Sequence, residues 1–326
     1  MASFEAQDRA DIFVSHAFDE QLVDLGEIWM NYATTGGSDL PALLLVPAQV
    51  QSWWSYEKAM ALLAEHFQVY AVDLRGQGRS TQTPGRYTLD NMGNDLVRFI
   101  DVVIGRPTVV SGNSSGGVLA AWLSAYAKPG QLRGAAYEDP PLFASETNPA
   151  VGQSIRQSIG PMFAVMHKWL GDQWSIGDFT GMQAATPREL PQHVLIALGR
   201  MGIGGPPDQA PPSDPPQNMK EYDPEWARAF WSGAASAACD HARMLAAVKV
   251  PVLITHHFRE IDAGTGSLMG AVSDLQVSRA RELITGAGQA CQVVDLPDMV
   301  HGMHDADPER FAQIILDWSS SLAPAA

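Results

Sequence analysis

The sequence is poor in cysteine and in basic residues. Its two cysteines, Cys239 and Cys291, lie far apart and outside any CxxC spacing, so we expect neither a disulfide framework nor a cysteine-based metal site. There are 21 Lys and Arg against 36 Asp and Glu, which gives a formal net charge of −15. Such a chain repels phosphate backbones and anionic lipid surfaces. Nucleic acid and membranes are therefore not expected partners.

Long apolar runs are also missing from the sequence. No segment approaches the roughly 18 consecutive apolar residues that cross a bilayer, and the first residues lack a basic stretch followed by an apolar one. We therefore expect a cytoplasmic protein. Hydrophobic residues nevertheless make up 46% of the chain and charged residues only 17%, which is typical of a large buried core.

Short apolar, β-branched segments alternate with segments of helical period, which predicts a mostly parallel sheet with helices on both faces. Two alternating segments predict antiparallel strands at one edge. The eight predicted strands span residues 11–16, 27–33, 42–48, 68–74, 107–112, 132–139, 250–257 and 292–298. The predicted helices between and after them span residues 55–67, 89–104, 116–127, 273–284 and 308–318.

This alternation stops over residues 140–246, which contain helical stretches and a proline-rich run at 204–216. Proline removes backbone donors and fixes φ, so the run cannot be a regular core element. We predict a core domain made of residues 1–139 and 247–326, and a mostly helical cap made of residues 140–246. The proline-rich run is interpreted as an exposed loop of the cap, with a mobile gate over the site as the alternative.

The strongest local motif is Gly112-Asn113-Ser114-Ser115-Gly116, which follows an apolar strand and opens a helical segment. This is the G-x-S-x-G nucleophile elbow in its required strand, turn and helix context. The tight turn needs small neighbours and lifts the Ser114 hydroxyl clear of the sheet. It also aims the Ser115 amide at an oxyanion formed by attack on a carbonyl. Ser114 is therefore the predicted nucleophile.

A serine hydroxyl needs an imidazole to accept its proton. Of nine histidines, His301 follows the last predicted strand and precedes the last helix, so it lies on a loop at the carboxyl edge of the sheet beside the elbow. We assign it as general base, with His304 as a supporting loop residue. The pairs His301/His304 and His256/His257 lack a third ligand at metal spacing, so no metal is predicted.

Two loops can supply the acid that orients the histidine. Asp139 ends one strand before two prolines and is favoured; Glu138, one residue earlier, should face the other side of that strand and is the alternative. Glu260 and Asp262 follow the next strand and form a third option, although histidines and a phenylalanine occupy the place where a small glycine turn is common.

The second oxyanion donor should come from the loop that follows ALLLV (42–46) and begins with Pro47, which we call the oxyanion loop. Pro47 has no N–H, so the amide of Ala48 or Gln49 is the candidate.

The motifs DLRGQGRS (73–80), GNSSGG at the elbow and MVHGMHDADPERF (299–311) resemble those of the α/β-hydrolase superfamily over nearly the whole chain. That resemblance implies the α/β-hydrolase fold: a mostly parallel eight-stranded sheet with helices on both faces and a helical cap. It also implies a Ser-His-acid mechanism that needs no cofactor.

Within the superfamily the chain resembles the bacterial and fungal zearalenone hydrolases, and particularly the actinobacterial type. The paired serines at the elbow, the VPAQ segment (46–49), the acidic residue after the sixth strand and YDPEWARAF (222–230) carry this likeness. The resemblance implies a lactonase that opens the macrocyclic ester of an apolar aromatic lactone, and a homodimer. It implies that Trp226 contacts the ligand, and we expect Trp54, after the oxyanion loop, to line the same cavity.

Two rival functions use the same features. A carbon–carbon bond hydrolase of aromatic ring-cleavage products would keep the same triad, whereas a hydrolase-fold receptor would sense a small lactone with only incidental chemistry. Haloalkane dehalogenases and epoxide hydrolases of this fold carry an aspartate at the elbow, so Ser114 counts against both.

Overall fold

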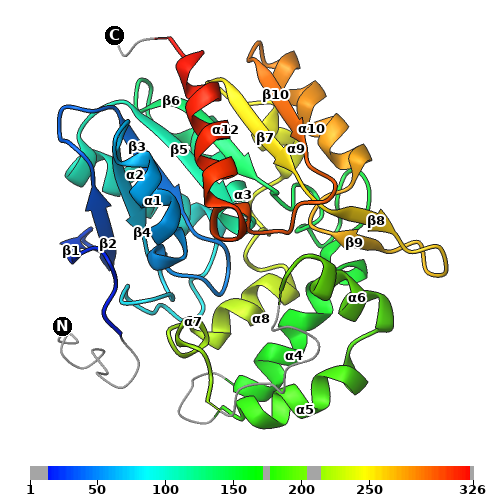
Figure 1. Cartoon of the computed structure of the whole chain (residues 1–326). Coiled ribbons are helices and arrows are strands. Elements are labelled where there is room, and N and C mark those ends of the chain that lie inside the picture. The colour runs from blue at the N-terminus through cyan, green and yellow to red at the C-terminus, as the bar shows by residue number, and fades with distance from the viewer. Residues whose placement is uncertain (1–13, 172–176, 204–213, 324–326) are drawn as a thin grey trace.

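The computed structural model describes residues 14–171, 177–203 and 214–323 (Figure 1). A central eight-stranded sheet has the order β1-β2-β4-β3-β5-β6-β7-β10. Strand β2 pairs antiparallel with β1 and with β4, and all other pairs are parallel. The strands are β1 (Glu20–Asp24), β2 (Trp29–Thr35), β3 (Ala42–Val46), β4 (Gln68–Val72), β5 (Thr108–Asn113), β6 (Leu132–Glu138), β7 (Val252–His256) and β10 (Cys291–Asp295).

The central strands are apolar on both faces, and helices cover each face of the sheet. On β3, Leu43 and Leu45 join one apolar layer while Leu44 and Val46 join the other, as the alternation of side chains along a strand requires. The first layer is closed by α1 (Glu57–Leu63), α11 (Met303–Ala306) and α12 (Pro308–Ser320). The second is closed by α2 (Leu89–Phe99), which continues as the π-helical turn Ile100–Ile104, α3 (Ser115–Tyr126) and α10 (Asp274–Gly286).

The connection between β6 and β7 carries the helices that lie below the sheet in Figure 1. They are α4 (Gly160–Leu170), α5 (Phe179–Glu189), α6 (Gln192–Arg200), α7 (Gln217–Lys220) and α8 (Pro224–Ser232), after the short 3-10 helix Ile155–Gln157. We use the name cap for these helices and the segments that join them. Helix α4 packs on α5 and α8, but α9 (His241–Leu245) packs on α3 and α10. The chain thus returns to the core layer before residue 246. Most of the proline-rich run lies outside the described residues.

The predicted α/β-hydrolase sheet is confirmed, but its first strand was misplaced. Residues 14–16 form no strand, the rest of the predicted 11–16 segment lies outside the described residues, and the edge strand is Glu20–Asp24. This strand is mostly exposed, so it lacks the apolar pattern that would reveal it. A short hairpin, β8 (Arg259–Ile261) and β9 (Leu268–Gly270), was not predicted. None of the described helices has the length and apolarity of a membrane span.

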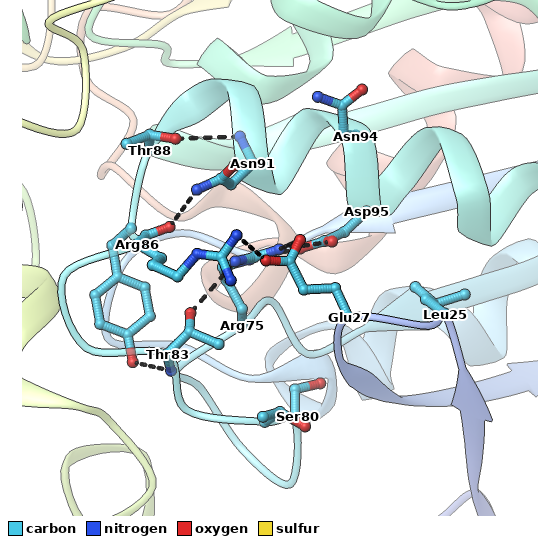
Figure 2. A network of polar contacts seen from close by, with 12 residues as sticks. Leu25, Glu27, Arg75, Ser80, Thr83, Arg86, Thr88, Asn91, Asn94 and Asp95 are labelled. Carbon is cyan, nitrogen blue, oxygen red and sulfur yellow. Dashed lines mark hydrogen bonds and ion pairs between the residues drawn. The ribbon is translucent and has the colours of Figure 1, made fainter.

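A buried arginine anchors the loop that follows β4. The Arg75 guanidinium donates from Nε and Nη2 to both carboxylate oxygens of Asp95 on α2, over 2.7 and 2.8 Å, and Glu27 lies 3.4 Å from Nη2 (Figure 2). Glu27 also pairs with Arg86 at the far end of the loop. The next residue, Tyr87, donates its hydroxyl to Asp223, the N-cap of α8. The network therefore fixes a core loop on which the cap rests.

Asp95→Asn should lower the free energy of unfolding by about 3 to 5 kcal/mol, because it leaves the Arg75 charge buried with a weakened partner. The matched control is Glu282→Gln, which breaks the exposed Arg279–Glu282 pair and should cost under about 1 kcal/mol. Urea unfolding followed by circular dichroism measures both. Equal midpoints for the two variants would contradict an anchoring role for Arg75.

Candidate active site

Ser114 occupies a strained turn between β5 and α3, with φ 54° and ψ −119°. The turn leaves no room for side chains at its two glycines. A Cβ on Gly112 would come within 2.2 Å of the Gly116 carbonyl oxygen, and one on Gly116 within 2.2 Å of the Val46 carbonyl oxygen. The Ser114 amide donates to the Glu138 carbonyl oxygen over 2.9 Å. The G-x-S-x-G pattern therefore has the steric basis of a nucleophile elbow.

His301, in the turn after β10, is paired with Asp139. Its Nδ1 lies 2.6 Å from Asp139 Oδ2, and the carboxylate is almost completely buried. Because a carboxylate only accepts, Nδ1 carries the proton and Nε2 is left as the basic nitrogen. Burial alone would raise the pKa of Asp139, but the neighbouring His257 and the hydrogen bond from His301 outweigh it and hold that pKa below its usual value. Asp139 therefore stays ionised opposite the imidazole.

A second histidine and carboxylate lie beside this pair. His304 Nδ1 is 2.9 Å from each carboxylate oxygen of Glu138, and its amide donates to Oε1 over 3.1 Å. Both side chains are buried, and Tyr56 stacks on the imidazole with ring centroids 4.1 Å apart. Glu138 and Asp139 thus hold two histidines of one loop. Glu138 is the partner of His304 and not of His301.

The backbone of His301 is held on two sides. Its carbonyl oxygen accepts from Asn113 Nδ2 over 2.9 Å, so the residue before Ser114 fixes the histidine turn. Its amide donates to the Met201 carbonyl oxygen, which follows α6 of the cap. These contacts bring the elbow, the histidine loop and the cap to one place.

The third option for the acid is placed elsewhere. Glu260 lies on the β8–β9 hairpin, half exposed, and pairs with Arg200 over 2.7 Å. Asp262 lies on the same hairpin and accepts from the amide and hydroxyl of Thr265. Both carboxylates therefore serve surface contacts of the hairpin.

The loop after β3 lies against the start of α3. A Cβ on Gly116 would also come within 2.6 Å of the Pro47 carbonyl oxygen, so the two backbones are in direct contact. The Ala48 carbonyl oxygen accepts from Gln77 Nε2 over 2.8 Å, and Val50 adopts a φ of 63°. Ser115 is buried at the first position of α3, where helical amides have no partner within the helix. The arrangement gives an oxyanion two possible sources of N–H.

A small cavity of about 20 Å³ opens beside Ser114. Its walls come from the oxyanion loop, from the segment after β6, from the cap and from the segment after β9, and they are mostly apolar. The lining residues are Gln49, Ser114, Pro141, Ala144, Ser145, Ile155, Ser158, Ile159, Phe163, Phe230 and Ala271.

The two tryptophans predicted to contact a ligand lie outside this lining. Trp226, on α8, is buried between Tyr87 and Tyr222, with ring centroids 6.1 and 5.9 Å away. Trp54 stacks on His16 and donates its indole N–H to Glu221. Phe230, one helical turn after Trp226, reaches the cavity. Ligand contact by either tryptophan stays a prediction.

Two further contacts were not foreseen. Gln49 Nε2 donates to the hydroxyl of the cap residue Tyr222 over 2.5 Å, and His257 donates its amide to Asp139 over 3.3 Å. Both contacts join segments that are far apart in the chain, so no local sequence pattern predicts them. Within the described ranges, no group of three or more His, Cys, Asp or Glu side chains is arranged to hold a metal ion.

The sequence matches the alpha/beta hydrolase family over residues 43–314, and the chain belongs to that family. It is 29% identical over 98 residues to 3-oxoadipate enol-lactonase 2 of Acinetobacter baylyi, covering 30% of this chain and 37% of the relative. It is 31% identical over 126 residues to bifunctional epoxide hydrolase 2 of Sus scrofa, covering 38% and 22%. The matches therefore span well under half of these curated relatives.

Solved structures of the same fold cover much more of the chain. The enol-lactonase from Burkholderia xenovorans LB400 superposes with a TM-score of 0.63 at 17% identity, over 92% of this chain and all of that one. An esterase from Rhodococcus sp. ECU1013 superposes with a TM-score of 0.58 at 20% identity, over 94% of this chain and all of that one. At sequence identities of 17% and 20%, these superpositions establish the shared fold alone.

Separate carboxylate variants test which acid orients His301. Asp139→Asn should lower kcat on an activated ester by ~10⁴, because the amide no longer fixes the imidazole tautomer. Glu138→Gln should cost far less, and Glu260→Gln should match the wild type. If Glu138→Gln loses most of its activity while Asp139→Asn stays active, then Glu138 and not Asp139 orients His301.

Proposed function

We propose that this protein is a serine hydrolase that cleaves carboxylic esters, with Ser114 as nucleophile, His301 as general base and Asp139 as the orienting acid. The observation that carries the proposal is the buried His301–Asp139 pair, held by Asn113 beside the strained elbow. A serine at the elbow suits acyl transfer. The alpha/beta hydrolase family and the partial match to an enol-lactonase support the same class.

The reaction follows from these positions in two halves. Ser114 Oγ attacks the ester carbonyl carbon and passes its proton to His301 Nε2, while the amides of Ser115 and of Gln49 or Ala48 stabilise the oxyanion. Collapse breaks the carbon–oxygen bond, and the leaving alkoxide takes the proton from His301. A water molecule then attacks the acyl-enzyme, with His301 again as base, and releases the acid and free Ser114.

We further propose that the ester is a macrocyclic lactone of the zearalenone type. The support is the resemblance at VPAQ and YDPEWARAF, the apolar cavity wall with Phe163 and Phe230, and a relative named for a lactone substrate. Ligands of this size need roughly several hundred Å³, so the proposal requires the cavity of about 20 Å³ to widen when a ligand binds.

Incubation with zearalenone should yield a product heavier by one water, detected by mass spectrometry over many turnovers per active site. Ser114→Ala should keep the fold and lose ~10⁴ to 10⁶ in rate. A well-folded Ser114→Ala variant that keeps more than about a tenth of the activity would contradict the assignment. A wild-type reaction that stops after about one turnover would indicate a receptor, and a product of carbon–carbon cleavage the rival hydrolase.

The role of Trp226 can be separated from its burial with Trp226→Phe, which keeps an aromatic ring in the cap. If the indole contacts the ligand, kcat/KM for zearalenone should fall roughly tenfold, since about 1 to 2 kcal/mol of binding is lost. Hydrolysis of a small activated ester should change by less than about twofold. Equal losses on both substrates together with a lower Tm would make Trp226 a structural residue of the cap.

A further inference from the structure

One short segment of the cap is hydrogen-bonded to the oxyanion loop, to Trp54 just after it, and to Gly76 in the loop after β4. It runs from α7 to the start of α8, over residues 218–223. The bonds are Asn218 Nδ2 to the Val50 carbonyl oxygen (2.9 Å), Ser52 Oγ to Glu221 Oε2 (2.6 Å), Trp54 Nε1 to Glu221 Oε2 (3.1 Å), Gln49 Nε2 to the Tyr222 hydroxyl (2.5 Å), and the Asp223 amide to the Gly76 carbonyl oxygen (2.8 Å).

The cap side of these bonds is largely buried, whereas Asn218, Gln49 and Trp54 are half-buried. Tyr222 is completely buried, and Ser52, Glu221 and Asp223 are nearly so. Burial raises the pKa of Glu221, although hydrogen bonds from Ser52, Gln217 and Trp54 act against that rise. Loss of the buried partners Tyr222 or Glu221 would leave polar groups without their hydrogen bonds, so the bonds from Gln49 and Ser52 restrict where the loop can lie.

In the proposed mechanism this loop faces the carbonyl that Ser114 attacks. Gln49 borders the cavity with Ser114, and the amide of Gln49 or Ala48 is the second oxyanion donor of the proposed mechanism. On the core side the loop is held by Gln77 and by contact with Gly116. On the cap side Tyr222 holds the Gln49 side chain, next to Val50 with its positive φ. The position of the donor amide thus depends on the cap.

We propose that Tyr222 is a positioning residue for the oxyanion hole, acting through Gln49. The cap then contributes to the chemical step of every ester, including those too small to touch it. This rests on the proposed serine hydrolase function. It differs from substrate recognition, because a recognition residue changes selectivity among esters whereas a positioning residue slows all of them.

Tyr222→Phe removes the hydroxyl and keeps the ring that packs on Trp226. We expect kcat to fall about ten- to a hundredfold on both zearalenone and p-nitrophenyl acetate, with KM within about twofold, since one misplaced oxyanion donor costs up to ~10² to 10³. Tyr32→Phe is the matched control: it also removes a tyrosine hydroxyl bonded to a glutamine, Gln21, but on the β1–β2 edge. It should leave kcat unchanged.

Two further measurements identify the path of the effect. The rate at which a fluorophosphonate probe labels Ser114, mapped by mass spectrometry, should fall in Tyr222→Phe in step with kcat, because the phosphoryl oxygen uses the same hole. In a double-mutant cycle, Tyr222→Phe should have little further effect once Gln49→Ala is present. If Tyr222→Phe fails to fold, Gln49→Ala alone should show the same loss of kcat.

The opposing results are distinct. Unchanged kcat and labelling in a folded Tyr222→Phe variant, a change confined to KM for zearalenone, or independent effects of Tyr222→Phe and Gln49→Ala would each overturn the positioning role. A wild-type protein whose Ser114 takes no label would overturn the proposed hydrolase, and this role with it. Labelling that is equally fast in wild type and Tyr222→Phe would leave the hydrolase standing and remove the role of Tyr222.

Discussion

The hydrogen bond between His301 and Asp139 is the contact on which the site depends. It leaves Nε2 of the imidazole free to take a proton, and it compensates a carboxylate that is buried almost completely. The same carboxylate is approached by His257, so positive partial charge surrounds it on more than one side. Removal of either partner would leave the other group buried without its counterpart, so structure and chemistry are coupled at this point.

The sheet explains how residues 162 positions apart come to share a hydrogen bond. Strands β5, β6, β7 and β10 run parallel, so the residues that follow them meet at one edge. Ser114 follows β5, Asp139 follows β6 and His301 follows β10. Glu138 links the first and last of these loops, because its carbonyl oxygen accepts from Ser114 and its side chain from His304. The cap then closes over this edge through Met201, Tyr222 and Asp223.

The sequence predicted the parts of the molecule that follow from local pattern. Runs of apolar residues predict the buried strands, and the glycines that the tight turn requires predict the elbow. Alternation along β6 led us to favour Asp139 over Glu138 as the partner of His301, but it did not indicate that Glu138 would hold His304 of the same loop. The edge strand β1 was not predicted, because its side chains are mostly exposed and do not alternate between apolar and polar residues. The Gln49–Tyr222 hydrogen bond could not be predicted, because the two residues are 173 positions apart and neither belongs to a motif that names its partner.

Proton NMR in the far-downfield region tests the central pairing most directly, because a buried imidazole proton bonded to a carboxylate exchanges slowly with water and resonates downfield of the amide protons. Two such signals are expected, one from the buried His301–Asp139 pair and one from the buried His304–Glu138 pair. One should vanish in both His301→Ala and Asp139→Asn, and the other in both His304→Ala and Glu138→Gln. If the signal that His301→Ala removes persists in Asp139→Asn and disappears in Glu138→Gln, then Glu138 orients the base and the His301–Asp139 pairing is contradicted.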